Sequence, residues 1–286
     1  MATSDIASAG TLPAKRSAPP TTQRSRNREL LGELVRRDLK ARYRGSNLGI
    51  LWSLLNPLLY MIVYSIVFGL FLKQRIQNPG LGELPYPVFL LPGLLVFNFF
   101  SQGLAASVNS VLGNGGLVKK VAFPTVLLTL SAIIAAFVNF LISLALLVPI
   151  LAFYHVHVGV ALLAVPLAAL VIFAFALGLG MLVAAGNVFF RDIEYLLTIA
   201  LQVWIFMTPI IYQLEVVTQS HQGFAKWVLY ANPLTWVVTS FQDTIAFNRW
   251  PQHWLGLGYS TLVSLVLVVL GTLLFRRMQG RFAEEL

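Results

Sequence analysis

The chain has 286 residues, of which 57% are hydrophobic and only 11% are charged, with a formal net charge of +9. A soluble domain carries about 25% charged residues, so this composition excludes an ordinary soluble globular protein and predicts an integral membrane protein. The absence of cysteine excludes disulfides and thiolate metal sites.

The first 46 residues divide into two parts. Residues 1–28 are rich in Ser, Thr, Pro, Ala and Arg and lack the apolar core of a secretory signal. We therefore expect a disordered cytoplasmic tail, with an organellar transit peptide as the alternative. Residues 29–46 predict an amphipathic helix, because apolar residues recur every three or four positions. Such a helix lies in the cytoplasmic interface of a membrane, with its cations toward anionic headgroups.

Six apolar segments without Asp, Glu, Lys or Arg follow, and each is long enough to be read as a membrane span. They cover residues 48–72, 88–111, 125–154, 160–186, 196–213 and 255–275, of which the fifth is the shortest. The sequence therefore predicts an all-α integral membrane protein, with a six-span domain over 47–276 and a short cytoplasmic C-terminus over 277–286.

Lys and Arg are distributed unequally between the two sides of these spans. Residues 1–47 hold ten of the twenty, and the 112–124 loop, the 187–195 loop and the C-terminus hold six more. Because short loops rich in Lys and Arg stay in the cytoplasm, both termini are predicted to be cytoplasmic. The positive charge is thus expected to set the orientation of the spans in the membrane and to contact membrane lipids. We expect no nucleic acid partner.

The one long polar connection, residues 214–254, is predicted to lie on the external side and is rich in aromatic residues. An amphipathic loop that rests on the headgroups is one interpretation. The other is a pair of short re-entrant helices that dip into the outer leaflet, which requires that protein or a water-filled cavity shelters the non-helical backbone.

Several functions are disfavoured by what the spans lack. No span has an acidic or basic residue, which argues against a proton relay but leaves open sodium sites built from carbonyls and hydroxyls. The spans also lack the residue pairs and clusters that intramembrane proteolysis needs. Residues 113–120, GNGGLVKK, fail the spacing of a phosphate-binding loop. Any active transport must therefore take its energy from another polypeptide.

Four local patterns resemble the transmembrane subunit of ABC-2 type exporters, in the branch that moves O-antigen, teichoic acid and other cell-surface polysaccharides. They are RDLKARYRGSNLGILWSLLNPLLY at 37–60, LVKKVAFP at 117–124, NVFFRDIEYLL at 187–197 with FMTPIIY at 206–212, and ANPLTWVV at 231–238. The resemblance covers most of residues 29–275. It implies two copies of this chain with two copies of a separate ATPase subunit. That subunit would hold the ATP and Mg²⁺, so this chain would bind no cofactor and catalyse no reaction.

The resemblance also implies which residues face the ATPase. The 112–124 and 187–195 loops would carry coupling helices that sit in clefts of that subunit. We expect ATPase coupling from Arg42, Lys119, Lys120, Phe123, Pro124, Arg191 and Asp192. Two lysines, an aromatic side chain that can insert into a cleft and a helix that starts at proline suit the transmission of rigid-body motion. Arg191 and Asp192 can form charge-assisted hydrogen bonds with the ATPase. Ordinary helix capping and topology anchoring by the lysines are the alternatives.

A slowly winding stripe in the first span repeats every four positions and comprises Trp52, Asn56, Tyr60, Tyr64 and Phe68. A similar series in the fifth span comprises Trp204, Thr208 and Tyr212. Aromatic faces with polar rims suit sugars, and a ladder of weak contacts suits a moving polymer. We expect these residues to line the substrate path, with core packing or an interfacial belt as the alternative. Pro57 and Pro209 predict kinks or breaks in the two spans.

Three functions follow, in order of preference. The first is the permease subunit of an exporter that moves a lipid-linked polysaccharide across the bacterial cytoplasmic (inner) membrane. The second is an ABC-2 exporter of another cargo, such as a drug or a lipid. The third, from another class, is a membrane-embedded lipid-modifying enzyme.

Overall fold

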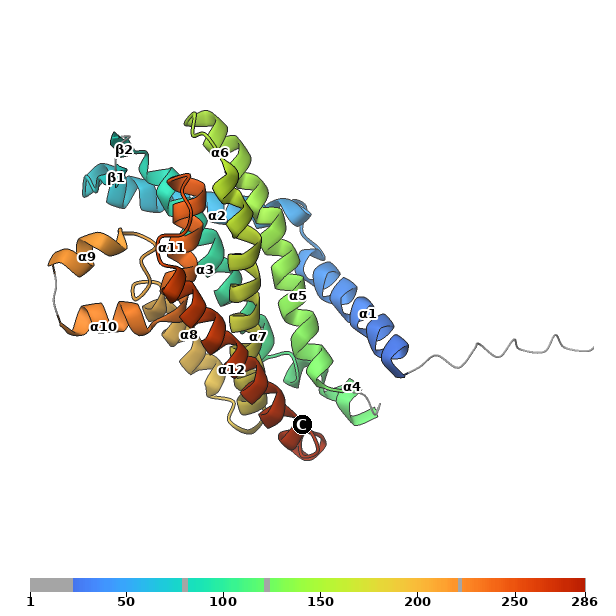
Figure 1. Ribbon diagram of the computed structural model, residues 1–286. Helices are drawn as coiled ribbons and strands as arrows, with labels where there is room; N and C mark the ends of the chain where they lie inside the picture. The colour runs from blue at the N-terminus through green and yellow to red at the C-terminus, as the bar shows by residue number, and fades with distance from the viewer. Residues whose placement is uncertain (1–22, 79–81, 121–123, 221–222, 286) are drawn as a thin grey trace, which may run out of the picture.

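The computed structural model describes residues 23–78, 82–120, 124–220 and 223–285 and is mostly helical (Figure 1). Within these ranges, five helices are long and apolar enough to cross a membrane: Gly49–Phe71, Tyr86–Val108, Val126–Phe153, Val160–Phe189 and Trp254–Met278. They match five of the six predicted spans, with ends that differ by a few residues. The remaining predicted span, 196–213, is not a continuous helix.

Three of these spans consist of more than one helical segment. The first joins η1 (Gly49–Leu51), α2 (Trp52–Tyr64) and the π-helix η2 (Ser65–Phe71). The third joins α5 (Val126–Ser143), η4 (Leu144–Leu146) and α6 (Leu147–Phe153), and the fourth joins η5 (Val160–Ala164) and α7 (Val165–Phe189). The second and the last are single helices, α3 (Tyr86–Val108) and α12 (Trp254–Met278). Helix α2 continues through Pro57, which lies inside it.

A short hairpin between the first two spans departs from the all-α prediction. Strands β1 (Ile76–Asn78) and β2 (Gly82–Leu84) pair in antiparallel fashion, with Ile76 opposite Leu84. Strands of this length are too short for an alternating pattern to be read from the sequence. The side chain of Gln213 anchors the hairpin, because its Oε1 accepts from the Gln77 backbone N–H at 3.2 Å and its Nε2 donates to the Gln77 carbonyl at 3.0 Å.

The N-terminal helix α1 runs from Gln23 to Tyr43 and so begins earlier than the predicted start at residue 29. It packs against α5, and Leu34 on its apolar face is buried. Two polar contacts fix this packing: Arg37 Nη1 donates to Asn114 Oδ1 at 2.8 Å, and Ser131 Oγ donates to Asp38 Oδ2 at 2.8 Å. Helix α1 is therefore tied both to the third span and to the loop that follows the second.

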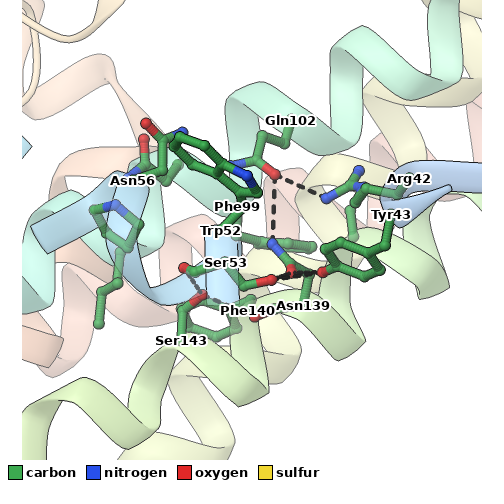
Figure 2. Close-up of a pocket in the computed structure, with 14 residues that line it drawn as sticks. Arg42, Tyr43, Trp52, Ser53, Asn56, Phe99, Gln102, Asn139, Phe140 and Ser143 are labelled. Carbon is green, nitrogen blue, oxygen red and sulfur yellow. Dashed lines mark hydrogen bonds between the residues drawn. The ribbon is translucent and has the colours of Figure 1, made fainter. Parts of the chain in front are cut away.

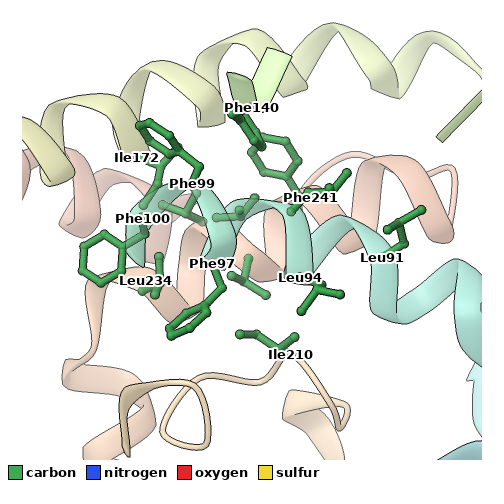
Figure 3. Packing of buried hydrophobic residues seen from close by; sticks show 14 of the residues in the cluster. Leu91, Leu94, Phe97, Phe99, Phe100, Phe140, Ile172, Ile210, Leu234 and Phe241 are labelled. Atoms are coloured by element: carbon green, nitrogen blue, oxygen red, sulfur yellow. The ribbon is translucent and has the colours of Figure 1, made fainter. Parts of the chain in front are cut away.

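Helix α3 forms the centre of the bundle. In its most apolar stretch 78% of residues are buried inside the chain, against 11% in the first span. Figure 3 shows side chains of α3 packed among residues of α5, α7 and α11 (Pro233–Phe241). Within this core, the ring of Phe100 stacks on that of Phe175 with centroids 5.3 Å apart, and it meets the Trp204 ring edge-on with centroids 5.1 Å apart. The first span contributes little to the core, so most of its surface is available to lipid or to another chain.

The predicted fifth span is interrupted about halfway. Helix α8 covers only Ile193–Trp204, and turns replace the helix over residues 205–210. Twelve helical residues rise about 18 Å, which is little more than half of the roughly 30 Å hydrocarbon core of a bilayer. Pro209 explains the break, because proline removes an N–H donor, clashes with the preceding turn and disfavours helix at the residue before it.

The carbonyls of residues 206–211 all accept hydrogen bonds although the helix is interrupted there. Side chains donate to the carbonyls that the helix leaves free: Asn232 to Met207 at 3.0 Å, Gln242 to Pro209 at 3.0 Å, and Tyr86 to Ile211 at 2.8 Å. The Tyr212 hydroxyl donates to the Phe206 carbonyl at 3.0 Å, and the Ile210 N–H donates to the Thr208 carbonyl at 2.7 Å. Non-helical backbone at membrane depth needs such partners, since lipid supplies none.

Residues 214–254 contain four helical segments: α9 (Leu214–Ser220), α10 (Phe224–Ala231), α11 and the π-helix η6 (Gln242–Ala246). Helix α11 and η6 are buried against the bundle, whereas α9 and α10 lie at its side (Figure 1). Buried Asp243 closes the turn before α12, where its carboxylate accepts from Arg249 at 2.7 Å and from the Gln252 backbone N–H at 2.9 Å. Burial raises the pKa of Asp243, and these bonds oppose that shift by stabilising the charged form.

Helices α7 and α12 pack along much of their length, and each carries a glycine where they approach closely. A Cβ added to Gly178 would lie 2.6 Å from the Leu267 carbonyl carbon, and one added to Gly271 would lie 2.8 Å from the Gly178 carbonyl oxygen. Small residues of this kind allow the backbones of membrane helices to come together.

We expect Gly178→Ala to lower the melting temperature of the purified chain in detergent, because the added methyl group must push the two backbones apart. Overpacking costs about 1–3 kcal/mol, which the higher helix propensity of Ala, worth about 1 kcal/mol, offsets only in part. Gly258→Ala in α12 is the matched control, since nothing lies within 4 Å of an added Cβ there. Equal melting temperatures for the two variants would contradict the close approach.

We also expect Asn232→Leu to destabilise the chain, because it leaves the Met207 carbonyl and the Trp204 indole N–H without partners. Each unpaired buried group costs about 1–3 kcal/mol. The control is Asn109→Leu, which removes an exposed amide that donates to Glu194. Thermal unfolding followed by tryptophan fluorescence checks this, and an Asn232 variant as stable as the Asn109 variant would show that the interrupted segment does not depend on this amide.

Candidate functional site

The last three residues of the predicted stripe on the first span form a ladder of rings. The Tyr60 and Tyr64 rings stack with centroids 6.3 Å apart, and Tyr64 meets Phe68 at 6.1 Å. Trp52 and Tyr60 are 46% and 47% exposed, so their faces are open to a ligand or to another chain. Phe68 is only half-buried and packs against the main core.

A polar cavity of about 290 Å³ lies where the end of α1 meets α2, α3 and α5. Figure 2 shows Arg42 and Tyr43 reaching from α1 toward side chains of α3 and α5. The amides and hydroxyls that line it come from four different elements: Tyr43, Ser53, Asn56, Asn98, Gln102, Asn139 and Ser143. Trp52 adds an aromatic face, and Arg42 is the only charged residue among those that line this cavity.

Hydrogen bonds between the helices hold this cavity in shape. Asn139 Oδ1 accepts from the hydroxyls of Tyr43 and Ser53, and Ser143 Oγ donates to the Ser53 carbonyl at 2.9 Å. The Arg42 guanidinium donates to Gln102 Oε1 at 2.8 Å. These bonds join α1, α2, α3 and α5, so the cavity wall is fixed by the tertiary structure.

A second cavity, of about 490 Å³, lies between α2, α3 and α8. Tyr60 and Tyr64 line one side, and apolar residues such as Leu94 and Leu201 line much of the remainder. Asn98 and Gln102 line both cavities. The two cavities therefore adjoin along the stripe of the first span and form one groove, which we call the α2 groove. No Asp or Glu is among the residues that line it.

Asn56 is the one amide of this groove that the predicted stripe includes, whereas Asn98, Gln102 and Asn139 were not predicted from the sequence. Asn98 and Gln102 are four residues apart in α3, and Asn139 and Ser143 have the same spacing in α5. Residues at this spacing share one face of a helix. Polar pairs of this kind inside apolar spans are the signal that would have found them, because such groups face the bundle interior or a cavity and not lipid.

The structure does not place the second predicted series in the α2 groove. The Trp204 ring lies in the main core, and its Nε1 donates to Asn232 Oδ1 at 3.1 Å. Thr208 is fully buried and accepts from Asn232 Nδ2 at 3.0 Å. Tyr212 is half-buried beside them. In the single chain, these three residues support the interrupted segment that follows α8.

The residues predicted to couple to the ATPase fall into three places. Arg42 lies in the polar cavity and not on an outer face. Lys119 is exposed on α4 (Gly115–Lys120), and Pro124 precedes α5, where its carbonyl accepts from the Leu127 N–H at 3.0 Å. The side chain of Lys120 and the whole of Phe123 lie outside the described residues.

The turn between α7 and α8 carries Arg191 and Asp192, and both are exposed. Neither side chain makes a hydrogen bond or ion pair with any residue that the structure describes. Phe190 and Tyr195 flank them and are 70% and 73% exposed. An exposed turn with two large aromatic rings and two unpaired charges is suited to docking into another protein.

A small hydrophobic cluster connects these two surfaces. It is centred on buried residues of α7 and α12 and includes Val118 from α4, Phe189 from the start of the turn and Phe282 from α13 (Phe282–Glu285). Figure 1 places α4, the α7–α8 turn and the C-terminus at one end of the bundle. Movement of either surface would therefore be passed to α7 and α12 through close packing.

The described residues contain no group of three or more His, Asp or Glu side chains arranged to hold a metal ion. The α2 groove instead offers amides, hydroxyls, aromatic rings and a single cation. These groups can bind a neutral or anionic hydroxylated molecule, and they include no pair of acid and base.

Comparisons with known proteins cover nearly the whole chain. The sequence profile of the family described as ABC-2 type transporter matches residues 29–246. The O-antigen export system permease protein RfbA of Myxococcus xanthus is 33% identical over 259 residues, which cover 91% of this chain and 96% of that protein. A protein of the same name from Klebsiella pneumoniae is 29% identical, and the polysialic acid transport protein KpsM of Escherichia coli is 25% identical. They cover 90% and 85% of this chain and 95% and 91% of their own lengths.

The family profile spans most of the chain, and the sequence patterns at 37–60, 117–124, 187–212 and 231–238 all fall within it. The chain therefore belongs to the ABC-2 type transporter family.

Proposed function

We propose that the chain is the transmembrane subunit of an ABC exporter that moves a lipid-linked cell-surface polysaccharide, such as an O-antigen or teichoic acid, across the bacterial cytoplasmic membrane. The observation that carries this proposal is the match, over nearly its whole length, to permeases named for O-antigen export and polysialic acid transport. The chain acts as a transport subunit and not as an enzyme, and ATP and Mg²⁺ are bound by a separate ATPase.

The α2 groove supports a glycan as cargo. Aromatic faces stack on the CH patches of sugar rings, and amides pair with sugar hydroxyls, while the lack of carboxylates avoids holding the polymer too tightly. Trp52, Asn56, Tyr60 and Tyr64 line the groove from one helix, so a chain of sugars can meet equivalent contacts as it advances.

We further propose six membrane passes with both termini in the cytoplasm. The fifth pass combines α8 with the interrupted segment that follows it. Side chains from α3, from the start of α11 and from η6 stabilise this segment. The unequal distribution of Lys and Arg supports this orientation. Helix α1 would lie at the cytoplasmic interface, and the 214–254 segment would form the external closure of the path, with α11 and η6 as its re-entrant part.

The working assembly would contain two copies of this chain and two copies of the ATPase. The sparsely buried first span suits contact with the second copy, because its exposed stripe would then face an enclosed path. Helix α4 and the α7–α8 turn would insert into the ATPase, which then moves α7 and α12 through the small cluster they share.

We expect the double variant Arg191→Ala, Asp192→Ala to lower ATP-driven glycan export in proteoliposomes by about tenfold, because charge-assisted hydrogen bonds at the ATPase contact are lost. Insertion into the membrane should be unchanged, since both side chains are exposed. Arg75→Ala at the opposite end, which breaks only the exposed pair with Glu83, is the control. Normal export by the double variant would remove the coupling role.

Substitution of aromatic residues in the stripe of the first span tests whether the stripe lines the path of the glycan. Trp52→Ala and Tyr60→Ala should each reduce glycan-stimulated ATP hydrolysis by about fivefold, equivalent to about 1 kcal/mol of lost aromatic contact. Val63→Ala is the control, because Val63 is exposed on the same helix but lines neither cavity. If all three variants hydrolyse ATP at the same rate, the stripe serves packing and not transport.

A further inference from the structure

The polar cavity of the α2 groove contains a cation without a counterion. Arg42 is half-buried, and no carboxylate of the described residues lies within ion-pair distance of it. Asp38, one turn earlier, is already engaged, because its Oδ1 accepts from Arg37 at 3.0 Å and its Oδ2 from Ser131 at 2.8 Å. Burial lowers the pKa of Arg42, yet a guanidinium stays charged in proteins. The cavity thus holds a positive charge that Asp38 stabilises only from a distance and that no carboxylate of the described residues contacts.

A neutral donor in the same cavity lacks a hydrogen-bond partner among the described residues. The side-chain Nδ2 of Asn98 is buried and makes no hydrogen bond with any described residue. A buried donor left unpaired is unfavourable, so such a group usually meets a ligand or a water molecule. Gln102, which accepts from Arg42, is one helical turn from Asn98 and lines the same wall. The cation Arg42 and the unpaired amide of Asn98 therefore belong to one site.

The position of the cavity indicates where its ligand comes from. Arg42 stands near the end of α1, and Trp52 begins α2, so the cavity lies at the level of the first turns of the first span. In the proposed orientation this is the cytoplasmic side of the membrane, at the depth of lipid headgroups. The planar guanidinium presents paired N–H groups that match phosphate oxygens.

We propose that this cavity binds the phosphate group that joins the lipid anchor to the glycan, with Arg42 and Asn98 as donors and Trp52 against the first sugar. The inference rests on the proposed function and deepens it, because it names the chemical group that the chain recognises before the glycan moves along the stripe. It also gives Arg42 a role toward substrate in place of the expected role toward the ATPase. A phospholipid headgroup or free phosphate offers the same chemistry, so the test separates these sources.

Binding to the purified full chain in phosphatidylcholine nanodiscs tests the proposal, with undecaprenyl phosphate as the probe and undecaprenol as its phosphate-free match. We expect undecaprenyl phosphate to bind at least about tenfold more tightly than undecaprenol. We expect Arg42→Gln to weaken the binding of undecaprenyl phosphate by about tenfold. Asn98→Leu should weaken binding by a smaller factor, and Arg42→Lys should be intermediate. Arg44→Gln is the control, since Arg44 is exposed near the same helix end and does not line the cavity.

Four results would overturn the proposal. Equal losses in Arg42→Gln and Arg44→Gln would assign the effect to a general positive surface. Equal affinity for undecaprenol would show that the cavity does not recognise the phosphate group. Equally effective competition by phosphatidylglycerol or inorganic phosphate would show that the cavity is not specific for the lipid-linked substrate. If Arg42→Gln fails to fold, wild-type affinity in both Arg42→Lys and Asn98→Leu would also refute it. The assay uses neither glycan nor ATPase, so its failure leaves the export function standing, whereas absent export with intact probe binding counts against that function alone.

Discussion

The structure depends on a single constraint, which is that backbone carbonyls inside a membrane need donors. Residues 206–211 leave the helical pattern that α8 begins, and each of their carbonyls is nevertheless hydrogen-bonded. The donors include Tyr86 from α3, Asn232 at the start of α11 and Gln242 from η6. Helix α3 and the contiguous α11 and η6, which are far from α3 in sequence, are thereby fixed around one interruption, and that arrangement holds α11 against the bundle.

The electrostatics of the α2 groove follow from the same environment. An unpaired charge is expensive in a low-dielectric interior, so a half-buried cation that keeps its charge will favour an anionic ligand. Every other polar group in the polar cavity is neutral. In the proposed function this combination separates two tasks, because a single charged site would select an anionic head while the neutral stripe would bind sugars weakly enough to release them.

Close packing joins α4, the α7–α8 turn and the C-terminal helix at one end of the bundle. Val118, Phe189 and Phe282 meet in one small cluster with α7 and α12, and those two helices touch backbone to backbone at Gly178 and Gly271. Close-packed elements shift as rigid bodies, because an overlap of even one methyl group is resisted. A displacement at α4 or at the α7–α8 turn therefore moves both helices together.

The sequence by itself determined the five continuous spans and the stripe on the first, because long uncharged apolar runs and four-residue spacing are local properties. It did not locate the end of α8, although Pro209 marked a break nearby. Only the tertiary structure decided that Trp204 turns into the core, that Asn98, Gln102 and Asn139 line one cavity with Arg42, and that distant side chains stabilise the interrupted segment after α8. The physical reason is that each of these outcomes depends on a partner from another helix, and helical periodicity specifies which residues share a face but not what that face will meet.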